Sequence, residues 1–102
     1  MKPVAIHPQA ESEIETAADY YEHQRTGLGR EFRLDLESTL ARLVEHPAMY
    51  AIELDDVRLC TLKRFPFSIY YIDQIEQIWV VAVAHQSREL EYWLNRIATK
   101  DE

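Results

Sequence analysis

The segment that most constrains the fold runs from Ile78 to Ala84, where every residue is apolar. Most of its residues are β-branched or aromatic, which is typical of a β-strand. Successive side chains of a strand point to opposite faces, so both faces of this strand would be apolar. Such a pattern predicts a central strand with other parts of the chain packed on each side. The two predicted faces are Ile78, Val80, Ala82 and Ala84 on one side, and Trp79, Val81, Val83 and His85 on the other.

Two amphipathic helices are predicted in the first half of the chain. Apolar residues recur at helical spacing from Pro8 onward, and a second apolar stripe spans about residues 30–45. Gly27 and Gly29 bracket the turn between the helices, and His46-Pro47 ends the second one because the residue before proline avoids the α region. The two helices therefore form a hairpin whose apolar side needs a cover.

The second half of the chain predicts that cover. Residues 57–62 and 67–72 have strand character, and Asp73-Gln74 form a tight turn into a third strand over residues 75–85. Residues 2–7 predict a short first strand, residues 48–56 an irregular stretch, and residues 88–98 a short helix at the edge of the sheet. The order β-α-α-β-β-β-α predicts one α+β domain over residues 1–102, with the helical hairpin packed on one face of a small antiparallel sheet. Trp79 would lie on the opposite face, where we expect a partner or a second copy to cover it.

Composition narrows the function classes. The net charge of −7 argues against a general nucleic-acid binder, although residues 57–88 are locally basic. A single cysteine excludes an intramolecular disulfide, and the scattered histidines show no metal-ligand spacing, so we expect neither a metal nor a cofactor. The N-terminus lacks the apolar stretch of a secretory signal and no segment is long enough to span a membrane, which indicates a cytoplasmic protein.

Candidate functional residues gather near the ends of the predicted strands. Basic side chains there can bind phosphate or carboxylate, tyrosines can stack on bases, and a histidine can exchange a proton near neutral pH. Together they could cleave RNA. Each also has a structural interpretation: the basic residues as surface, the histidine as a hydrogen-bonding strand end, and one of two adjacent tyrosines as core. The set comprises Arg58, Lys63, Arg64, Tyr70, Tyr71, His85, Arg88 and Tyr92.

A longer pattern runs through these residues. The run Leu62-Lys63-Arg64-Phe65-Pro66-Phe67-Ser68-Ile69-Tyr70-Tyr71 is followed by Val80-Val81-Ala82-Val83-Ala84-His85, then by Arg88 and Tyr92-Trp93. Pro8, Ala10, Asp19-Tyr20-Tyr21 and Pro47 precede it at matching positions. In order and spacing, essentially the whole chain resembles the RelE/ParE superfamily of bacterial toxins.

This resemblance implies the toxin half of a type II toxin–antitoxin system, with the fold predicted above. Such toxins bind a small antitoxin that wraps the hairpin and the sheet, arrest growth when released, and can contribute to plasmid stabilisation. RelE-like members cleave mRNA on the ribosome without a metal. ParE-like members inhibit DNA gyrase and are not nucleases.

Carried over by position, the resemblance implies that Arg64, His85, Arg88 and Tyr92 are the catalytic residues, with Arg58, Lys63 and Tyr70 binding the substrate or target. In a nuclease, His85 would exchange protons, Arg64 and Arg88 would stabilise the phosphate, and Tyr92 would orient a base. The acidic balance departs from the strongly basic ribosome-dependent toxins. The sequence therefore leaves three activities open: a metal-independent endoribonuclease, a gyrase inhibitor, or a non-catalytic or degenerate module that only binds an antitoxin or another protein. It also leaves open a homodimer or a toxin–antitoxin hetero-oligomer.

Overall fold

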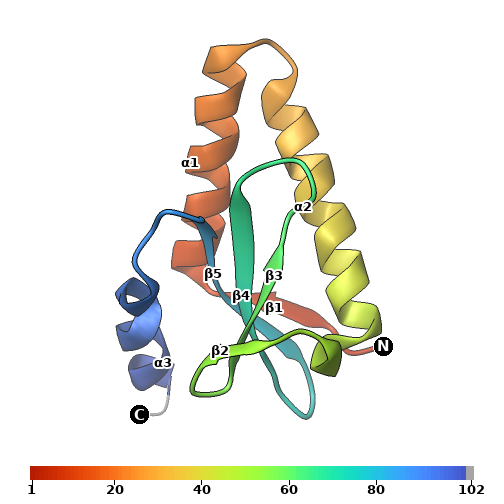
Figure 1. The fold of residues 1–102 in the computed structure, drawn as a ribbon, viewed down its shortest axis with the longest axis vertical. Coiled ribbons are helices and arrows are strands. Elements are labelled where there is room, and N and C mark those ends of the chain that lie inside the picture. Colours follow the sequence, from red (N-terminus) through yellow and green to blue (C-terminus); the bar gives the residue numbers. More distant parts are fainter. Residues whose placement is uncertain (101–102) are drawn as a thin grey trace.

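The computed structural model describes residues 1–100, with the side chains of all of these except residues 90, 91 and 98–100. The sheet has the strand order β1-β5-β4-β3-β2, in which β1 is parallel to β5 and the other pairs are antiparallel. Figure 1 shows the helical hairpin of α1 and α2 standing over this sheet. The elements are β1 (Val4–Ile6), α1 (Pro8–Gln24), α2 (Leu28–Glu45), the 3-10 helix η1 (Pro47–Met49), β2 (Ile52–Leu54), β3 (Val57–Thr61), β4 (Phe67–Asp73), β5 (Ile78–His85), the 3-10 helix η2 (Leu90–Trp93) and α3 (Leu94–Lys100).

The predicted α+β architecture is confirmed, with three corrections to the sheet. The stretch predicted to be irregular contains β2, a short edge strand that pairs with β3. The sheet is mixed and not wholly antiparallel, because the chain passes from β1 through the hairpin and the meander before β5 pairs beside it in the same direction. The third strand of the predicted meander begins at Ile78 and not at Ile75.

The alternation predicted for β5 fails halfway along the strand because of a β-bulge. Tyr70 pairs with Ala82 and Tyr71 with Val80, so Val81 has no residue opposite it in the register. One extra residue reverses the faces of everything that follows it. Val80 and Val83 consequently lie in the core beneath the hairpin, whereas Ala82 lies on the other face. Both faces of β5 are buried, as predicted.

The hairpin packs closely on the sheet around an aromatic cluster. Phe32 is fully buried, and its ring lies 5.5, 5.4 and 5.2 Å from the rings of Tyr21, Phe65 and Phe67. The two helices touch at Gly29, where a Cβ atom would lie 2.6 Å from the backbone carbonyl oxygen of Ala18. This close contact requires glycine and allows the two helices to approach each other at this point.

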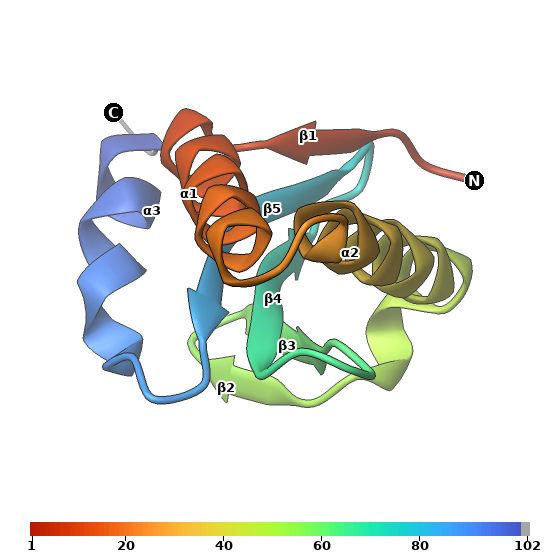
Figure 2. The ribbon, with the colours of Figure 1, turned by 90° about the horizontal axis from the view of Figure 1, so that it is seen from above.

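The C-terminal segment covers the opposite face of the sheet. Trp93 is fully buried, and its ring lies 5.8 Å from that of Tyr70, with Leu94 and Ile97 packed beside it. We expected a partner or a second copy to cover Trp79, but its side chain is already buried in this second core and is only 8% exposed. The prediction of an edge helix and an uncovered Trp79 is therefore wrong, because the C-terminal segment carries an apolar stripe of its own. Figure 2 shows α3 beside the sheet, away from α2.

Candidate functional site

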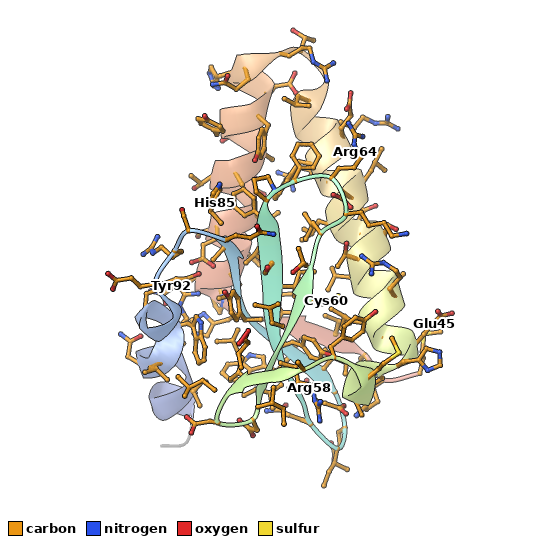
Figure 3. The ribbon with its side chains drawn as sticks, in the orientation of Figure 1. Glu45, Arg58, Cys60, Arg64, His85 and Tyr92 are labelled. Atoms are coloured by element: carbon orange, nitrogen blue, oxygen red, sulfur yellow. The ribbon has the colours of Figure 1, made fainter. Side chains whose placement is uncertain are left out.

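Two loops lie side by side at one end of the sheet and carry most of the predicted site. The β3–β4 loop (residues 62–66) and the loop after β5 (residues 86–89) are joined by a hydrogen bond from the backbone N–H of Gln86 to the carbonyl oxygen of Pro66, 2.8 Å. Figure 3 shows Arg64 and His85 toward this end and Arg58 toward the other. We call the exposed set Lys63, Arg64, His85 and Arg88 the basic edge.

His85 is oriented by its own loop. Its Nδ1 accepts a hydrogen bond from the backbone N–H of Ser87 at 3.1 Å and lies 2.9 Å from the Ser87 hydroxyl oxygen. Its ring also packs edge-on against Phe67, with centroids 5.4 Å apart. Because Nδ1 accepts, the neutral ring carries its proton on Nε2, and neither nitrogen has a lone pair free for a substrate proton. His85 would have to break its bonds to Ser87 before it could act as a general base.

Tyr92 supports the guanidinium groups around it. The guanidinium carbons of Arg88 and Arg96 lie 4.1 and 4.9 Å from the centroid of its ring. Burial and the neighbouring Glu13 carboxylate raise the pKa of the Tyr92 hydroxyl, although the two arginines oppose this effect. The ring is therefore neutral and occupied by cation–π contacts, which leaves little of it to stack on a base.

A part-buried ion pair anchors this end of the C-terminal segment. Arg96 forms a bidentate pair with Glu13 on α1, at 3.2 and 2.8 Å, and also donates to the carbonyl oxygen of Val81 at 3.0 Å. Glu13 accepts in turn from the backbone N–H of Val83 at 3.0 Å. The pairing of β1 with β5 ends where the backbone N–H of His7 donates to the carbonyl oxygen of Val80. Beyond that point, Glu13 and Arg96 provide the hydrogen-bond partners for the backbone at this edge of β5.

Sequence reasoning missed both members of this pair. Glu13 is one of several acidic residues of the first predicted helix and was not among the candidate residues, and Arg96 lay in no motif. Helical spacing held a signal for Glu13, since it follows Ala10 by three residues and therefore lies beside the apolar stripe. Nothing in the sequence linked it to Arg96.

A cleft opens beside this ion pair, between α1, the end of β5 and the loop that follows. Its volume is about 350 Å³, with a largely apolar floor and His85 and Arg88 at its rim. The cleft therefore combines apolar surface with exposed basic groups, as protein interfaces do. Its lining is Ser12, Glu13, Thr16, Ala17, Tyr20, Phe67, Val83, Ala84, His85, Arg88 and Tyr92.

Arg64 lies outside this cleft. Its guanidinium group donates to Glu31 on α2 at 2.9 Å, and Arg64, Lys63 and Glu31 line a separate hollow against that helix. The hydrogen bond from Arg64 lowers the pKa of the Glu31 carboxyl, and the charge of Arg25 acts in the same direction. The structure therefore brings His85, Arg88 and Tyr92 together at the cleft, whereas Arg64 lies outside it, beside Glu31 of α2.

Arg58 supports the backbone and does not reach the basic edge. Its guanidinium group donates to the carbonyl oxygens of Ala48 and Tyr50, at 3.1 and 2.6 Å. These bonds fasten the segment between α2 and β2 to β3. The position predicted to bind a substrate or target thus has a structural role at the far end of the sheet.

Tyr70 is also distant from solvent. It is 3% exposed and packs on Trp93 in the second core, so it offers no face to a target. Tyr71 points into the first core, where its hydroxyl donates to the carbonyl oxygen of Pro47 at 2.6 Å. Both tyrosines are therefore core residues, whereas the alternation of strand side chains predicted one of them in the core and Tyr70 at the target.

The neighbourhood of the ion pair predicts a pH dependence through His7. Its Nδ1 accepts from the backbone N–H of Gln9 and caps α1, which requires an unprotonated ring nitrogen. Burial and the charge of Arg96 lower the pKa of His7 from 6.5, against the opposing charge of Glu13. Below that ordinary value the unfolded chain binds the proton more readily than the folded one, so the free energy of unfolding falls as the pH falls.

Denaturant unfolding between about pH 7.5 and 5.5 measures this effect. His7→Asn keeps a capping side chain without a titrating group, so its stability is expected to fall less steeply with pH than that of the parent. The parent chain, measured in the same buffers, is the reference for this slope. Equal slopes for the parent and His7→Asn would contradict the assignment.

In the described part of the chain, no three His, Cys, Asp or Glu side chains are placed to hold a metal ion. None of the described helices is long and apolar enough to cross a membrane.

The fold and the site together define a class: small α+β domains in which a helical hairpin covers a sheet and a basic edge borders an apolar cleft. A family model described as the ParE toxin of the type II toxin–antitoxin system parDE matches residues 4–90. The chain therefore belongs to the ParE toxin family.

Comparison of structures agrees with this assignment at the level of the fold. A solved structure described as a chromosomal ParDE TA system from P. aeruginosa matches with a TM-score of 0.74 and 19% sequence identity. The match covers 83% of this chain and 96% of that chain. No curated protein matches this sequence.

Proposed function

We propose that this chain arrests growth by binding a protein target through its basic edge, without cleaving RNA. DNA gyrase is the target that membership of the ParE family favours. The observation that carries the proposal is the separation of the predicted catalytic groups. Arg64 lies outside the cleft that His85, Arg88 and Tyr92 line, and Nδ1 of His85 accepts a hydrogen bond from the backbone N–H of Ser87.

RNA cleavage demands more than this arrangement offers. A base must take the 2′-hydroxyl proton, cations must stabilise the charge on the phosphorus, and an acid must protonate the leaving oxygen, all around one phosphate. Here the rim of the cleft holds Arg88, His85 has no free lone pair, and Tyr92 is covered by guanidinium groups. These features favour binding over catalysis.

A protein target suits the same surface. Exposed basic groups beside an apolar cleft match the arrangement of an interface, with an apolar centre and a polar rim. Arg88 and Lys63 form no ion pair with the described residues, so both are available to carboxylates of a target. We infer that a cognate antitoxin keeps the chain inactive until it is released, as the family description implies.

Charge reversal tests the basic edge. Arg88→Glu replaces an attraction with a repulsion at the rim, so we expect target affinity to fall by about tenfold or more and growth arrest to be relieved. Growth and viable counts after induction of the chain alone measure this effect. Arg30→Glu, a charge reversal at another exposed arginine near the start of α2, is the control and should still arrest growth.

The substitution His85→Ala distinguishes target binding from RNA cleavage. Removing one rim side chain from an interface is expected to weaken arrest only in part, whereas removing the proton-exchanging group of a nuclease would abolish it. If His85→Ala at unchanged stability is harmless to cells, the binding mechanism is contradicted. If Arg88→Glu arrests growth as fully as the parent, the basic edge is not the target-binding surface.

A further inference from the structure

The backbone of the β3–β4 loop converges on one carboxylate, that of Asp35. Three consecutive backbone N–H groups of the loop donate to it: those of Lys63 at 3.3 Å, Arg64 at 2.8 Å and Phe65 at 3.3 Å. Successive N–H groups that turn inward in this way form an anion-binding concavity. In this chain the anion is supplied from α2, so the loop is fastened to the hairpin by its main chain.

Asp35 occupies a position where a carboxylate is costly. It lies in the middle of α2 and is 8% exposed, with the buried side chains of Leu36 and Thr39 close to it on the helix. Burying a carboxylate without partners would destabilise the fold, and a mid-helix aspartate has a poor helix propensity. Charge-assisted bonds to the three loop amides offset that cost. The hydrogen bonds to the loop therefore explain why an aspartate occupies this buried position of α2.

A second carboxylate holds the same loop by its side chain. Glu31 lies one helical turn before Asp35, on the same side of α2, and accepts from the guanidinium group of Arg64 at 2.9 Å. Arg64 is thus bound at its backbone by Asp35 and at its side chain by Glu31. The two contacts differ in strength, since the Arg64 side chain is 60% exposed and such surface pairs are weak and easily exchanged.

We propose that Asp35 is a positioning residue that acts on the target through Arg64. It fixes the loop so that Arg64 and Lys63 are presented on the basic edge, and the weak pair with Glu31 lets the guanidinium group exchange onto a target carboxylate. The backbone bond from Gln86 to Pro66 passes the same constraint to the neighbouring loop. This inference rests on the proposed function, because it requires Arg64 to contact the target.

A purely structural role for Asp35 makes a different prediction. The loop has other restraints: Phe65 is 7% exposed in the aromatic cluster, and the N–H of Leu62 donates to the carbonyl oxygen of Phe67 at 2.9 Å. If these restraints sufficed to hold the loop, Asp35→Asn would lower global stability only. At matched stability, the exchange rates of the loop amides and the growth arrest would then be unchanged. Positioning and stability must therefore be measured separately.

Amide hydrogen exchange measures the positioning directly. In purified Asp35→Asn, which keeps the shape but loses the charge, we expect the amides of Arg64 and Phe65 to exchange about tenfold faster or more. Thr39→Val is the matched control, because it removes a buried hydroxyl one turn further along α2 that donates to the carbonyl oxygen of Asp35 and accepts from Arg42, with no hydrogen bond to the described residues of the loop. Unchanged exchange of the loop amides in Asp35→Asn would overturn the proposal.

Growth arrest measures whether the positioning acts through Arg64. Arg64→Ala and Asp35→Asn should each reduce arrest, and the double variant should be no weaker than Arg64→Ala alone. Additive losses in the double variant, or a loss in Asp35→Asn no greater than in Thr39→Val at matched stability, would overturn this route. Full toxicity of Arg64→Ala would count against Arg64 in the proposed function, while amide exchange would still decide whether Asp35 holds the loop.

Discussion

Replacing Arg96 by methionine is expected to lower the free energy of unfolding by about 3 kcal/mol, since the change leaves a part-buried carboxylate without its cation. The Arg96 side chain is 9% exposed and that of Glu13 21% exposed, so the pair is shielded from water. The carbonyl oxygen of Val81 loses its donor at the same time. Urea unfolding followed by circular dichroism measures the loss.

The chain provides a matched control for this prediction. Arg33 forms an ion pair of 3.1 Å with Glu15, but their side chains are 41% and 68% exposed. Arg33→Met should cost less than about 1 kcal/mol, as is usual for pairs in water. The double variant Glu13→Gln with Arg96→Met should recover part of the stability lost in Arg96→Met, because no unpaired charge remains buried. Equal effects of Arg96→Met and Arg33→Met would contradict the anchoring role of the pair.

Trp93→Ala is expected to cost about 3–5 kcal/mol, because it empties the centre of the second core. The side chain is fully buried and packs on Tyr70, within the cluster that also contains Trp79. Removing it should also expose the apolar face of β5 and increase binding of a hydrophobic dye. Thermal unfolding and dye fluorescence measure the two effects.

Trp93→Phe distinguishes packing from hydrogen bonding at this position. The indole N–H of Trp93 has no hydrogen-bond partner among the described residues, so phenylalanine removes an unsatisfied donor while keeping an aromatic ring. We expect it to cost less than half as much as alanine. A loss as large as that of Trp93→Ala would mean that the indole N–H is bonded and that packing is not the main contribution.

Much of the fold follows from local patterns in the sequence. The apolar stripes of α1 and α2, the glycines between them and the alternating strands of the meander predicted the hairpin on the sheet. The bulge at Val81 was not predictable, because a single extra residue leaves no mark in a run where every residue is apolar. The short strand β2 was missed because its three residues include Glu53 and its pairing depends on β3.

The candidate site was predictable in membership but not in arrangement. The basic residues and His85 were identified from the sequence, and four of the set are exposed at one end of the sheet. Their partners were not identified: Glu31 and Asp35 lie 33 and 29 residues from Arg64, and helical periodicity gives no information about such contacts. These partners determine where each basic group lies, and our proposal that the chain binds a target without cleaving RNA depends on that arrangement.

The basic edge shows that the charge of this chain is unevenly distributed over its surface. A chain with a net charge of −7 is poorly suited to approach RNA, yet its exposed loops at one end of the sheet are basic. Acidic residues elsewhere act within the fold: Asp35 and Glu13 bind main-chain N–H groups, and Glu22 accepts from the amides of Gly27 and Gly29 at the start of α2. Part of the negative charge therefore has a structural cause.

The proposal that the chain binds a protein target without cleaving RNA is tested most directly by inducing the chain alone. Transcript ends and plasmid supercoiling are then measured in the same cells. We expect growth to stop with intact transcripts, while plasmids lose negative supercoils or DNA breaks accumulate. Arg88→Glu should leave both transcripts and DNA unchanged. New transcript ends at early times, with DNA topology unaffected, would contradict the account and identify the chain as a ribonuclease.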